Sequence, residues 1–225
     1  EQGSTDGTGT SATFKFPQAI TTDGTNLYVA DTANNKIRKI DTSTGFVTTL
    51  AGSGTMASTN GTGTAASFGH PAGITSDGTN LYVTDQNTHK IRKIVISTGV
   101  VTTLAGSGSA GSANGTGASA SFNKPRGITT DGTDLYVNDE SSYKIRRIAI
   151  ATGVVTTIAG SGSAASIDGT GTSASFNGAV AISTDGTNLY VSENGGSKIR
   201  KIALRDTVTA DVALHNLDDD TDVTV

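Results

Sequence analysis

The chain of 225 residues contains no cysteine and no tryptophan, and it has only 3 prolines, 5 tyrosines and 6 phenylalanines. The absence of cysteine excludes disulfide bonds and thiol chemistry, although it does not fix the cellular compartment. With so few aromatic residues, a core has to be built from Ile, Val, Leu and Ala. No apolar run approaches the roughly 18 residues of a transmembrane helix, and no signal peptide is visible.

The chain also has little excess charge, with a formal net charge of −4, which argues against nonspecific binding to nucleic acid. It is rich in glycine, with 29 copies, and in Ser, Thr and Asn. Because Gly, Ser and Asn favour turns and Thr favours strands, this composition predicts many short strands rather than helices. It is also typical of exported bacterial surface proteins, so we expect an extracellular or cell-surface location. The chain does not begin with Met, and we expect a processed form or part of a longer protein.

An internal repeat of 54 residues dominates the sequence. Four copies account for 216 of the 225 positions, with no insertion or deletion through the strand cores. The repeat is marked by an Asp-Gly turn (Asp23, Asp77, Asp131, Asp185), a Leu-Tyr-Val run (Tyr28, Tyr82, Tyr136, Tyr190), an Ile-Arg pair (Arg38, Arg92, Arg146, Arg200) and a Gly-Thr-Gly turn followed by phenylalanine (Phe14, Phe68, Phe122, Phe176).

Each copy is predicted to form four short strands. In the second copy these are residues 72–76, 81–85, 90–96 and 100–105, and the Asp-Gly-Thr-Asn turn at 77–80 is a strong hairpin signal. Four-stranded meanders repeated at this length predict an all-β fold of radially arranged propeller blades. We place one blade in each of about 1–54, 55–108, 109–162 and 163–214. Residues 215–225 then form an acidic tail, a linker or an extra strand.

The repeat resembles the NHL repeat in its pattern P-x-G-I-x-x-D-G-T-x-L-Y-V-x-D followed by K-I-R-K-I. The linker G-T-G-x-x-A-S-F-x-x-P resembles the NHL variant common in exported bacterial proteins. The resemblance implies an NHL-type β-propeller of about six blades, and it leaves function open, because such propellers include lyases, RNA binders, protein binders and sensor ectodomains. The fourth copy departs from the pattern at Ala179, at Glu193 and over residues 207–211.

Four copies leave the closure of the propeller open. Three interpretations remain: a small closed ring, part of a larger propeller, or a unit whose exposed edges pair with another copy. Unprotected edges and end repeats favour association.

An acidic residue ends the second strand of every copy: Asp31, Asp85, Asp139 and Glu193. These acids could form a ring of carboxylates that holds a cation. We favour a structural role instead, in which each acid accepts loop N–H groups or pairs with a basic side chain.

Basic residues cluster in the Lys-Ile-Arg-Lys/Arg runs, with three in each of four copies, or twelve of the 16. They could form a basic belt for RNA, but few aromatic residues accompany them for base stacking. We therefore expect solvated strands with salt bridges to neighbouring blades, and no nucleic-acid partner.

Neither the histidines nor the acidic tail predicts a metal site. The resemblance implies zinc-binding histidines in the NHL-type amidating lyases, but His70, His89 and His215 have no histidine at the equivalent positions of other copies. The acidic run 218–222 lacks the turn glycine of a calcium loop. No metal or cofactor is expected.

Positions that differ between copies are the candidates for function, because binding uses loops held on a rigid framework. Propeller topology places the end of the linker and the loop between the second and third strands on one face. The candidate binding face is Phe16, Gln18, Asn35, His70, His89, Lys124, Arg126, Asp139, Glu140, Tyr143 and Ser197. The third copy is the most suggestive part of it.

Together these features predict a non-enzymatic binding or scaffold module. We expect contacts with a protein partner or self-association, in an extracellular assembly or filament, with a small ligand as a further option and no membrane insertion. The alternative is a propeller hydrolase or lyase with a metal in the central channel. An enzyme should bring the acids and histidines to one point, whereas a scaffold should hold them at separate, equivalent positions.

Overall fold

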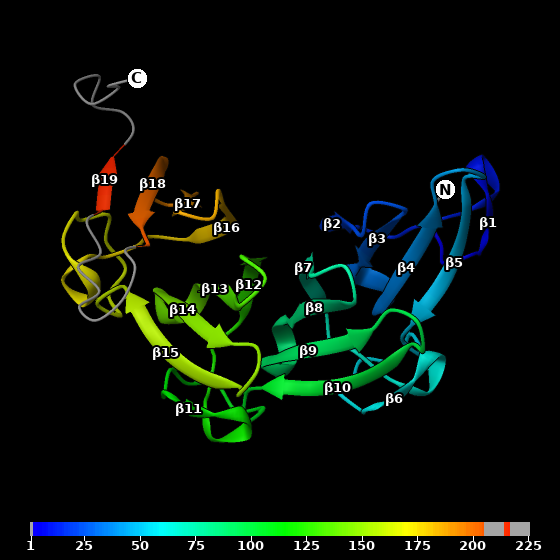
Figure 1. Cartoon of the computed structure of the whole chain (residues 1–225), viewed down its shortest axis with the longest axis horizontal. Coiled ribbons are helices and arrows are strands. Elements are labelled where there is room, and N and C mark those ends of the chain that lie inside the picture. The colour runs from blue at the N-terminus through cyan, green and yellow to red at the C-terminus, as the bar shows by residue number, and fades with distance from the viewer. Residues whose placement is uncertain (1, 205–213, 217–225) are drawn as a thin grey trace.

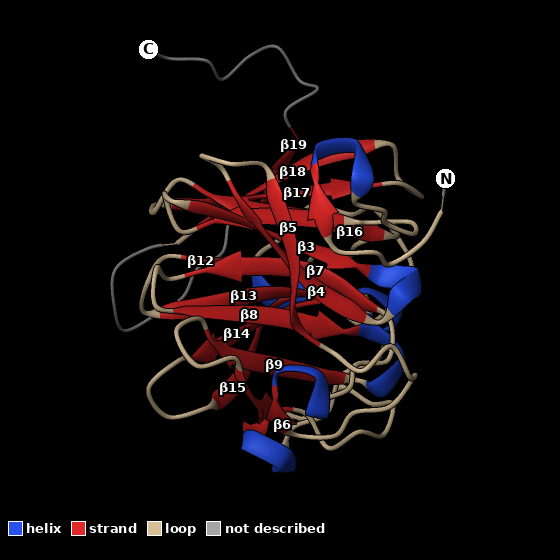
Figure 2. Ribbon diagram, turned by 90° about the vertical axis from the view of Figure 1, so that its right-hand side faces the viewer, coloured by secondary structure: helices blue, strands red, loops and turns tan. Residues whose placement is uncertain are grey.

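The structure, a computed structural model, describes residues 2–204 and 214–216. It contains four antiparallel sheets, one for each repeat, which follow one another around a common centre (Figure 1). The predicted all-β fold of four tandem blades is confirmed. Strands form the bulk of the molecule, and short 3-10 helices lie at its edge (Figure 2). In the described part of the chain, no helix has the length and apolar character needed to cross a membrane.

The strands recur with the period of the sequence. The first blade has β1 (Gly7–Thr8), β2 (Ala19–Thr22), β3 (Asn26–Asp31), β4 (Lys36–Asp41) and β5 (Phe46–Ala51). The second has β6 (Gly61–Thr62), β7 (Pro71–Ser76), β8 (Asn80–Asp85), β9 (Lys90–Val95) and β10 (Val100–Ala105). The third has β11 (Gly115–Thr116), β12 (Pro125–Thr130), β13 (Asp134–Asp139), β14 (Lys144–Ala149) and β15 (Val154–Ala159). The fourth has β16 (Ala179–Thr184), β17 (Asn188–Glu193), β18 (Lys198–Ala203) and β19 (Leu214–Asn216).

In the described part of the chain, seven single-turn 3-10 helices connect these strands. Four of them, η1 (Gly9–Ser11), η3 (Gly63–Ala65), η5 (Gly117–Ser119) and η7 (Gly171–Ser173), lie in the linkers. The other three, η2 (Thr32–Asn34), η4 (Gln86–Thr88) and η6 (Glu140–Ser142), form the loop between the second and third long strands of a blade.

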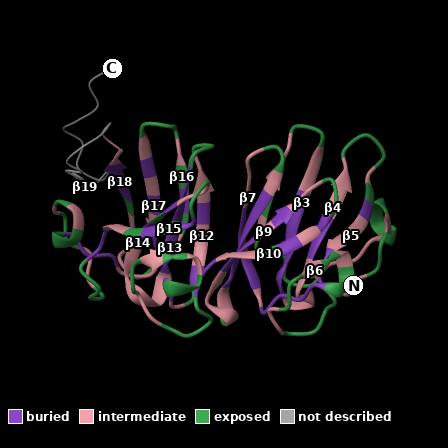
Figure 3. Ribbon diagram, turned by 60° about the horizontal axis from the view of Figure 1, so that its bottom comes forward, coloured by how far each residue is buried: buried purple, intermediate pink, exposed green. Residues whose placement is uncertain are grey.

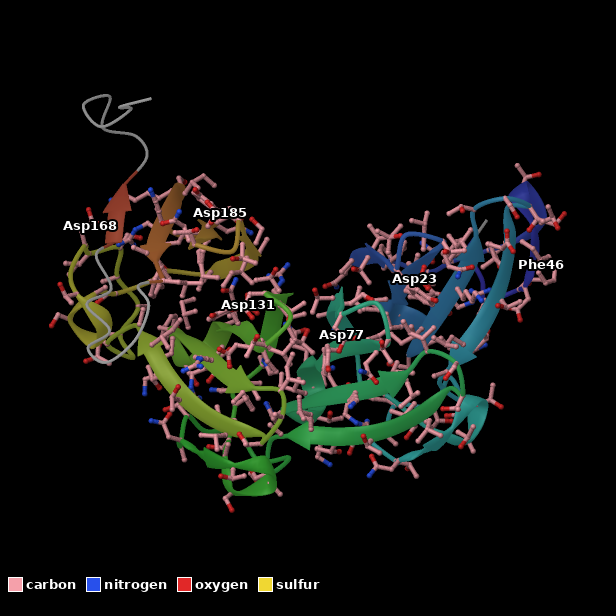
Figure 4. The ribbon with its side chains drawn as sticks, in the orientation of Figure 1. Asp23, Phe46, Asp77, Asp131, Asp168 and Asp185 are labelled. Carbon is pink, nitrogen blue, oxygen red and sulfur yellow. The ribbon has the colours of Figure 1, made fainter. Side chains whose placement is uncertain are left out.

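Within a blade the four long strands form a meander, and the linker adds a short outer strand that the sequence did not predict. In the first blade the order is β1-β5-β4-β3-β2, with Gly7 opposite Val47. The hairpin turn is fixed by Asp23, whose Oδ1 accepts the backbone N–H of Asn26 at 2.7 Å and whose Oδ2 accepts the hydroxyl of Tyr28 at 2.7 Å. Asp23, Asp77, Asp131 and Asp185 occupy equivalent places in the four blades (Figure 4).

The fourth blade departs from the repeat at its last strand. Leu214 of β19 pairs with Ile202, twelve residues earlier, whereas Val47 of β5 pairs with Ile40, seven residues earlier. The last strand therefore comes five residues later than the period predicts. His215, which we assigned to the tail, belongs to β19, and the acidic residues 218–222 lie outside the described residues.

The core lies between blades rather than inside them (Figure 3). We define the outgoing face of a blade by the residues that pack on the next blade, and the incoming face by those that pack on the previous one. In the junction of the first two blades the outgoing face is Tyr28, Ala30, Ile37 and Ala51, and the incoming face is Ala66, Phe68, Ile74, Leu81, Val83, Ile94 and Val101. The third long strand has apolar residues on both sides for this reason: Ile91 packs on the following blade and Ile94 on the preceding one.

In the described part of the chain, the outgoing face of the fourth blade is not buried on the incoming face of the first blade, as the faces of successive blades are. Ile20 is 58% exposed, although its equivalent Ile74 is 6% exposed, and Ile199 is 44% exposed, although its equivalent Ile37 is fully buried. The blades thus form an arc, with the first and fourth blades at its ends (Figure 1).

Candidate functional site

The repeated acids are structural. Asp31, Asp85, Asp139 and Glu193 are almost completely buried, each in its own blade, and each pairs with the arginine seven residues later at 2.9–3.3 Å. The other carboxylate oxygen accepts a backbone N–H in the first three blades, such as that of Asn123 on Asp139 at 2.6 Å. Burial raises the pKa of Asp139 to about 6, against the lowering effect of the Asn123 N–H and the charge of Arg146. Each acid is thus held inside its own blade, and the acids do not form a ring that faces the channel.

The repeated arginines are buried, which corrects our expectation of solvated strands. Arg38, Arg92, Arg146 and Arg200 have no exposed surface, and each guanidinium stacks on the phenylalanine of its own blade at 5.1–5.3 Å. Their buried partners belong to the same blade, not to a neighbour. A planar guanidinium can stack and bond in its plane at once, so it fills this site better than lysine. These four cations are unavailable to a nucleic acid.

The copy-specific positions occupy two loops of one face and share an unusual backbone conformation. At the end of the linker, Phe16, His70 and Lys124 have φ of 47°, 72° and 53°, and Gly178 takes the same place in the fourth copy with φ of 66°. In the loop before the third long strand, Asn35, His89, Tyr143 and Ser197 have φ of 52°, 57°, 54° and 52°. Left-handed conformation is uncommon for residues other than glycine and points to functional or structural constraint.

These two loops join neighbouring blades by hydrogen bonds. The Oδ1 of Asn35 accepts the backbone N–H of His70 at 3.0 Å, and the Nδ1 of His89 accepts that of Lys124 at 3.1 Å. Burial, and then the charge of Lys124, lowers the pKa of His89 and favours the neutral ring that can accept this bond. At the junction of the third and fourth blades Tyr143 and Gly178 take these places, and no such bond joins the two described loops.

A cavity of about 470 Å³ opens where that bond is missing. Its lining comes from all four blades and consists of Gln18, Gln86, Lys124, Arg126, Glu140, Ser141, Tyr143, Asn177 and Gly178. Glu140 organises it: one carboxylate oxygen pairs with Arg126 at 2.9 Å and the other accepts the Nε2–H of Gln86 at 3.1 Å. Lys124 is exposed, and none of the described acids forms an ion pair with it.

The cavity lies at the mouth of the central channel. The channel itself is lined by the innermost strands of the four blades, at residues 18–20, 72–74, 126–128 and 180–182, and Gln18 and Arg126 belong to both. We call the cavity lined by the nine residues above the channel-mouth site.

Five residues of the predicted binding face lie in this site: Gln18, Lys124, Arg126, Glu140 and Tyr143. Asn35, His70 and His89 lie in the loops that join the blades, and Phe16 and Ser197 are exposed in the equivalent loops of the first and fourth blades.

Asp139 is the exception, because it is buried against Arg146 and cannot reach a ligand at the mouth. The prediction missed Gln86, Ser141 and Asn177. A usable signal existed for Gln86, which stands one period before Glu140.

Among the described residues, no three of the His, Asp and Glu side chains lie together as metal ligands would. The acids stand at separate, equivalent positions, and His70 and His89 lie at two different junctions. The side chain of His215 lies outside the described part of the structure.

Comparison with known proteins finds relatives that match only part of this chain. No family model matches the sequence. Protein SUPPRESSOR OF QUENCHING 1, chloroplastic, of Arabidopsis thaliana is 35% identical over 137 residues, which is 56% of this chain and 13% of the relative. NHL repeat-containing protein 2 of Homo sapiens is 39% identical over 107 residues, or 45% of this chain and 15% of the relative. The chain therefore spans less than a sixth of the length of these curated relatives.

Solved structures agree on the fold. A protein of unknown function from Bacteroides thetaiotaomicron superposes with a TM-score of 0.69 at 26% identity, over 88% of this chain and 47% of that one. An auxiliary nutrient binding protein of Bacteroides ovatus gives 0.66 at 21% identity, over 91% and 49%. Virginiamycin B lyase of Staphylococcus aureus gives 0.55 at 20% identity, over 88% and 55%.

The blades, their order around one channel and these superpositions define a β-propeller protein. More narrowly, the repeat pattern and its named relatives support an NHL-repeat β-propeller family for this chain.

Proposed function

We propose that the chain is a non-enzymatic, exported binding module whose channel-mouth site takes a carboxylate-bearing segment of a protein partner. One observation carries the proposal. The residues in which the third copy differs from its neighbours converge on one cavity, at the only inter-blade junction where the described loops are not joined by the hydrogen bond seen twice elsewhere.

The lining suits an acidic ligand. Lys124 and Arg126 bring two positive charges to the mouth. Both carboxylate oxygens of Glu140 are already bonded, one to Arg126 and the other to Gln86. Arg126 is only partly engaged, with 36% of its side chain exposed. A ligand carboxylate would gain charge-assisted hydrogen bonds from both cations, and the partly exposed Tyr143 offers an aromatic surface beside them.

The comparisons support binding only at the level of the fold. Solved neighbours include auxiliary nutrient binding proteins, and the lyase neighbour has 20% identity. The export proposal rests on the Thr/Ser/Gly/Asn-rich, cysteine-free composition.

The test is fluorescence anisotropy with a labelled peptide that contains four glutamates between glycines, compared with its four-glutamine counterpart. We expect the acidic peptide to bind more tightly, and Lys124→Glu to weaken it about tenfold or more by replacing attraction with repulsion. Lys201→Glu is the matched control, because it makes the same charge change on β18, away from the mouth. Equal binding of both peptides, or equal effects of the two substitutions, would refute the proposed ligand class.

A further inference from the structure

The two ends of the arc carry the surfaces that the interior of the molecule buries. On the first blade the incoming face is uncovered: Phe14, Leu27 and Ile40 are partly exposed and Ile20 is 58% exposed. The equivalents of these four residues in the second blade are at most 6% exposed. A shallow, mostly apolar groove lies there, lined by Phe14, Pro17, Gln18, Ala19, Ile20, Val29 and Ile40.

The outgoing face of the fourth blade is uncovered in the same way. Tyr190 and Ser192 are partly exposed and Ile199 is 44% exposed, whereas Tyr28, Ala30 and Ile37 of the first blade have no exposed surface. At these three positions the fourth blade keeps the tyrosine and isoleucine of the internal outgoing faces and has serine where they have alanine, threonine or asparagine, and the equivalent of Ala51 lies outside the described residues.

We infer that the incoming face of the first blade binds the outgoing face of the fourth blade of a second copy, so that copies associate head to tail. The three internal junctions support this inference. In each of them Tyr, Ile and Ala of one outgoing face pack on Phe, Ile, Leu and Val of the next incoming face.

The loops beside the two end faces complete the likeness. Ser197 and Phe16 have the same left-handed conformation as Asn35 and His70, whose side chain and backbone N–H form the bond that joins the first two blades. In a head-to-tail pair, the Ser197 hydroxyl of one copy takes the place of the Asn35 amide opposite the Phe16 N–H of the other. The Bacteroides chain that superposes on 88% of these four blades continues for about as much again, so two copies match its extent.

A head-to-tail interface is heterologous, and it makes closed rings or open chains according to the rotation between copies. The end faces share only Gln18 with the channel-mouth site, and neither Ile20 nor Ile199 lines that site. Head-to-tail association can therefore fail without the proposed function, and the reverse also holds.

The experiment is analytical ultracentrifugation of the whole chain over a range of concentrations. We expect a species of twice the 22.6 kDa chain mass or a larger multiple. Ile20→Asp and Ile199→Asp each put a charge in the proposed contact without disturbing a buried position, and each should weaken association about 30-fold or more. Met56→Asp is the matched control, since Met56 is 64% exposed but lies in a linker outside both end faces.

Mixing the two variants distinguishes head-to-tail pairing from pairing of like faces. Each variant keeps one intact face, so an equal mixture of Ile20→Asp and Ile199→Asp should form a mixed dimer through one wild-type interface. A monomer at all concentrations would overturn the inference. So would association that both substitutions leave intact, or a mixture that stays monomeric while the wild type associates.

Discussion

The junction of the second and third blades and the junction of the third and fourth blades have the same apolar core but different polar contacts. Both bury Tyr, Ile and Ala of one blade against Phe, Ile, Leu and Val of the next. The first of them also has three side-chain hydrogen bonds between blades: His89 to the Lys124 N–H, Thr84 to the Arg126 carbonyl at 2.6 Å, and Gln86 to Glu140.

The second of them has no counterpart of these bonds among the described residues. Tyr143 occupies the position of His89, and Asn138 occupies the position of Thr84. Both polar side-chain atoms of Asn138 are buried without a hydrogen-bond partner. Apolar burial thus suffices to stack the blades, and the polar contacts decide where a cavity remains. The channel-mouth site lies where the repeat keeps its core and loses its polar contacts.

The largest effect should come from the part that the two junctions share. Arg146→Ala removes the partner of Asp139 and the stack on Phe122, which lies in the second–third junction, and Arg200→Ala does the same to Glu193 and Phe176 in the third–fourth. Leaving a buried acid unpaired costs about 3–5 kcal/mol. Urea unfolding should therefore show that both substitutions lower the free energy of unfolding by similar, large amounts. Arg147→Ala is the control, because its salt bridge is exposed by 48% on the arginine side and should cost about 1 kcal/mol or less.

The comparison between the two junctions would fail if one of these two substitutions left the free energy of unfolding nearly unchanged. That result would mean that the apolar cores of the two junctions, although alike in composition, do not depend equally on the ion pair behind the phenylalanine.

The next largest effect should come from restoring a hydrogen bond between the third and fourth blades. Asn138→Thr gives the third blade the side chain that donates to the next blade from Thr84, and it removes two buried polar atoms that lack partners. An unsatisfied buried polar group costs about 1–3 kcal/mol, so the variant should raise the midpoint of urea unfolding. The reverse exchange, Thr84→Asn, should lower it. A repair that destabilises the protein would show that Asn138 has a role that threonine cannot fill.

The sequence was sufficient for the blades because turns and alternation are local signals. The turn at Asp77 and the Leu-Tyr-Val alternation predicted a strand at 81–85, and the structure has Asn80–Asp85. The outer strand β1 was missed because two residues, Gly7 and Thr8, carry no periodicity. The buried arginines were misplaced because arginine is seldom buried unless paired. Each partner is the acid seven residues earlier, at the end of the preceding strand, and composition does not show that this pair is buried.

The site was half predictable for a related reason. Variation between copies identified Lys124, Arg126 and Tyr143, since these residues differ from their equivalents. It did not identify Gln86 or Asn177, because which loops of neighbouring blades meet at one cavity depends on how the blades curve around the channel. Asp139 was included wrongly because sequence does not show on which side of a strand end a carboxylate is buried.

The smallest effect is a pH dependence confined to the second–third junction. The pKa of His89 is lowered by burial and by the charge of Lys124, so the folded protein favours the neutral ring more than the unfolded chain does. The stability from this preference is complete above the unfolded pKa of about 6.5, and it is lost as the pH falls from there through the lower folded pKa. Protonation also turns Nδ1 from acceptor to donor, which opposes the Lys124 N–H. His89→Asn is the matched variant, because Asn35 makes the equivalent bond without titrating in this range. The unfolding midpoint of the wild type should therefore fall more steeply than that of His89→Asn between about pH 6.5 and pH 5, and parallel curves would show that His89 does not hold this junction.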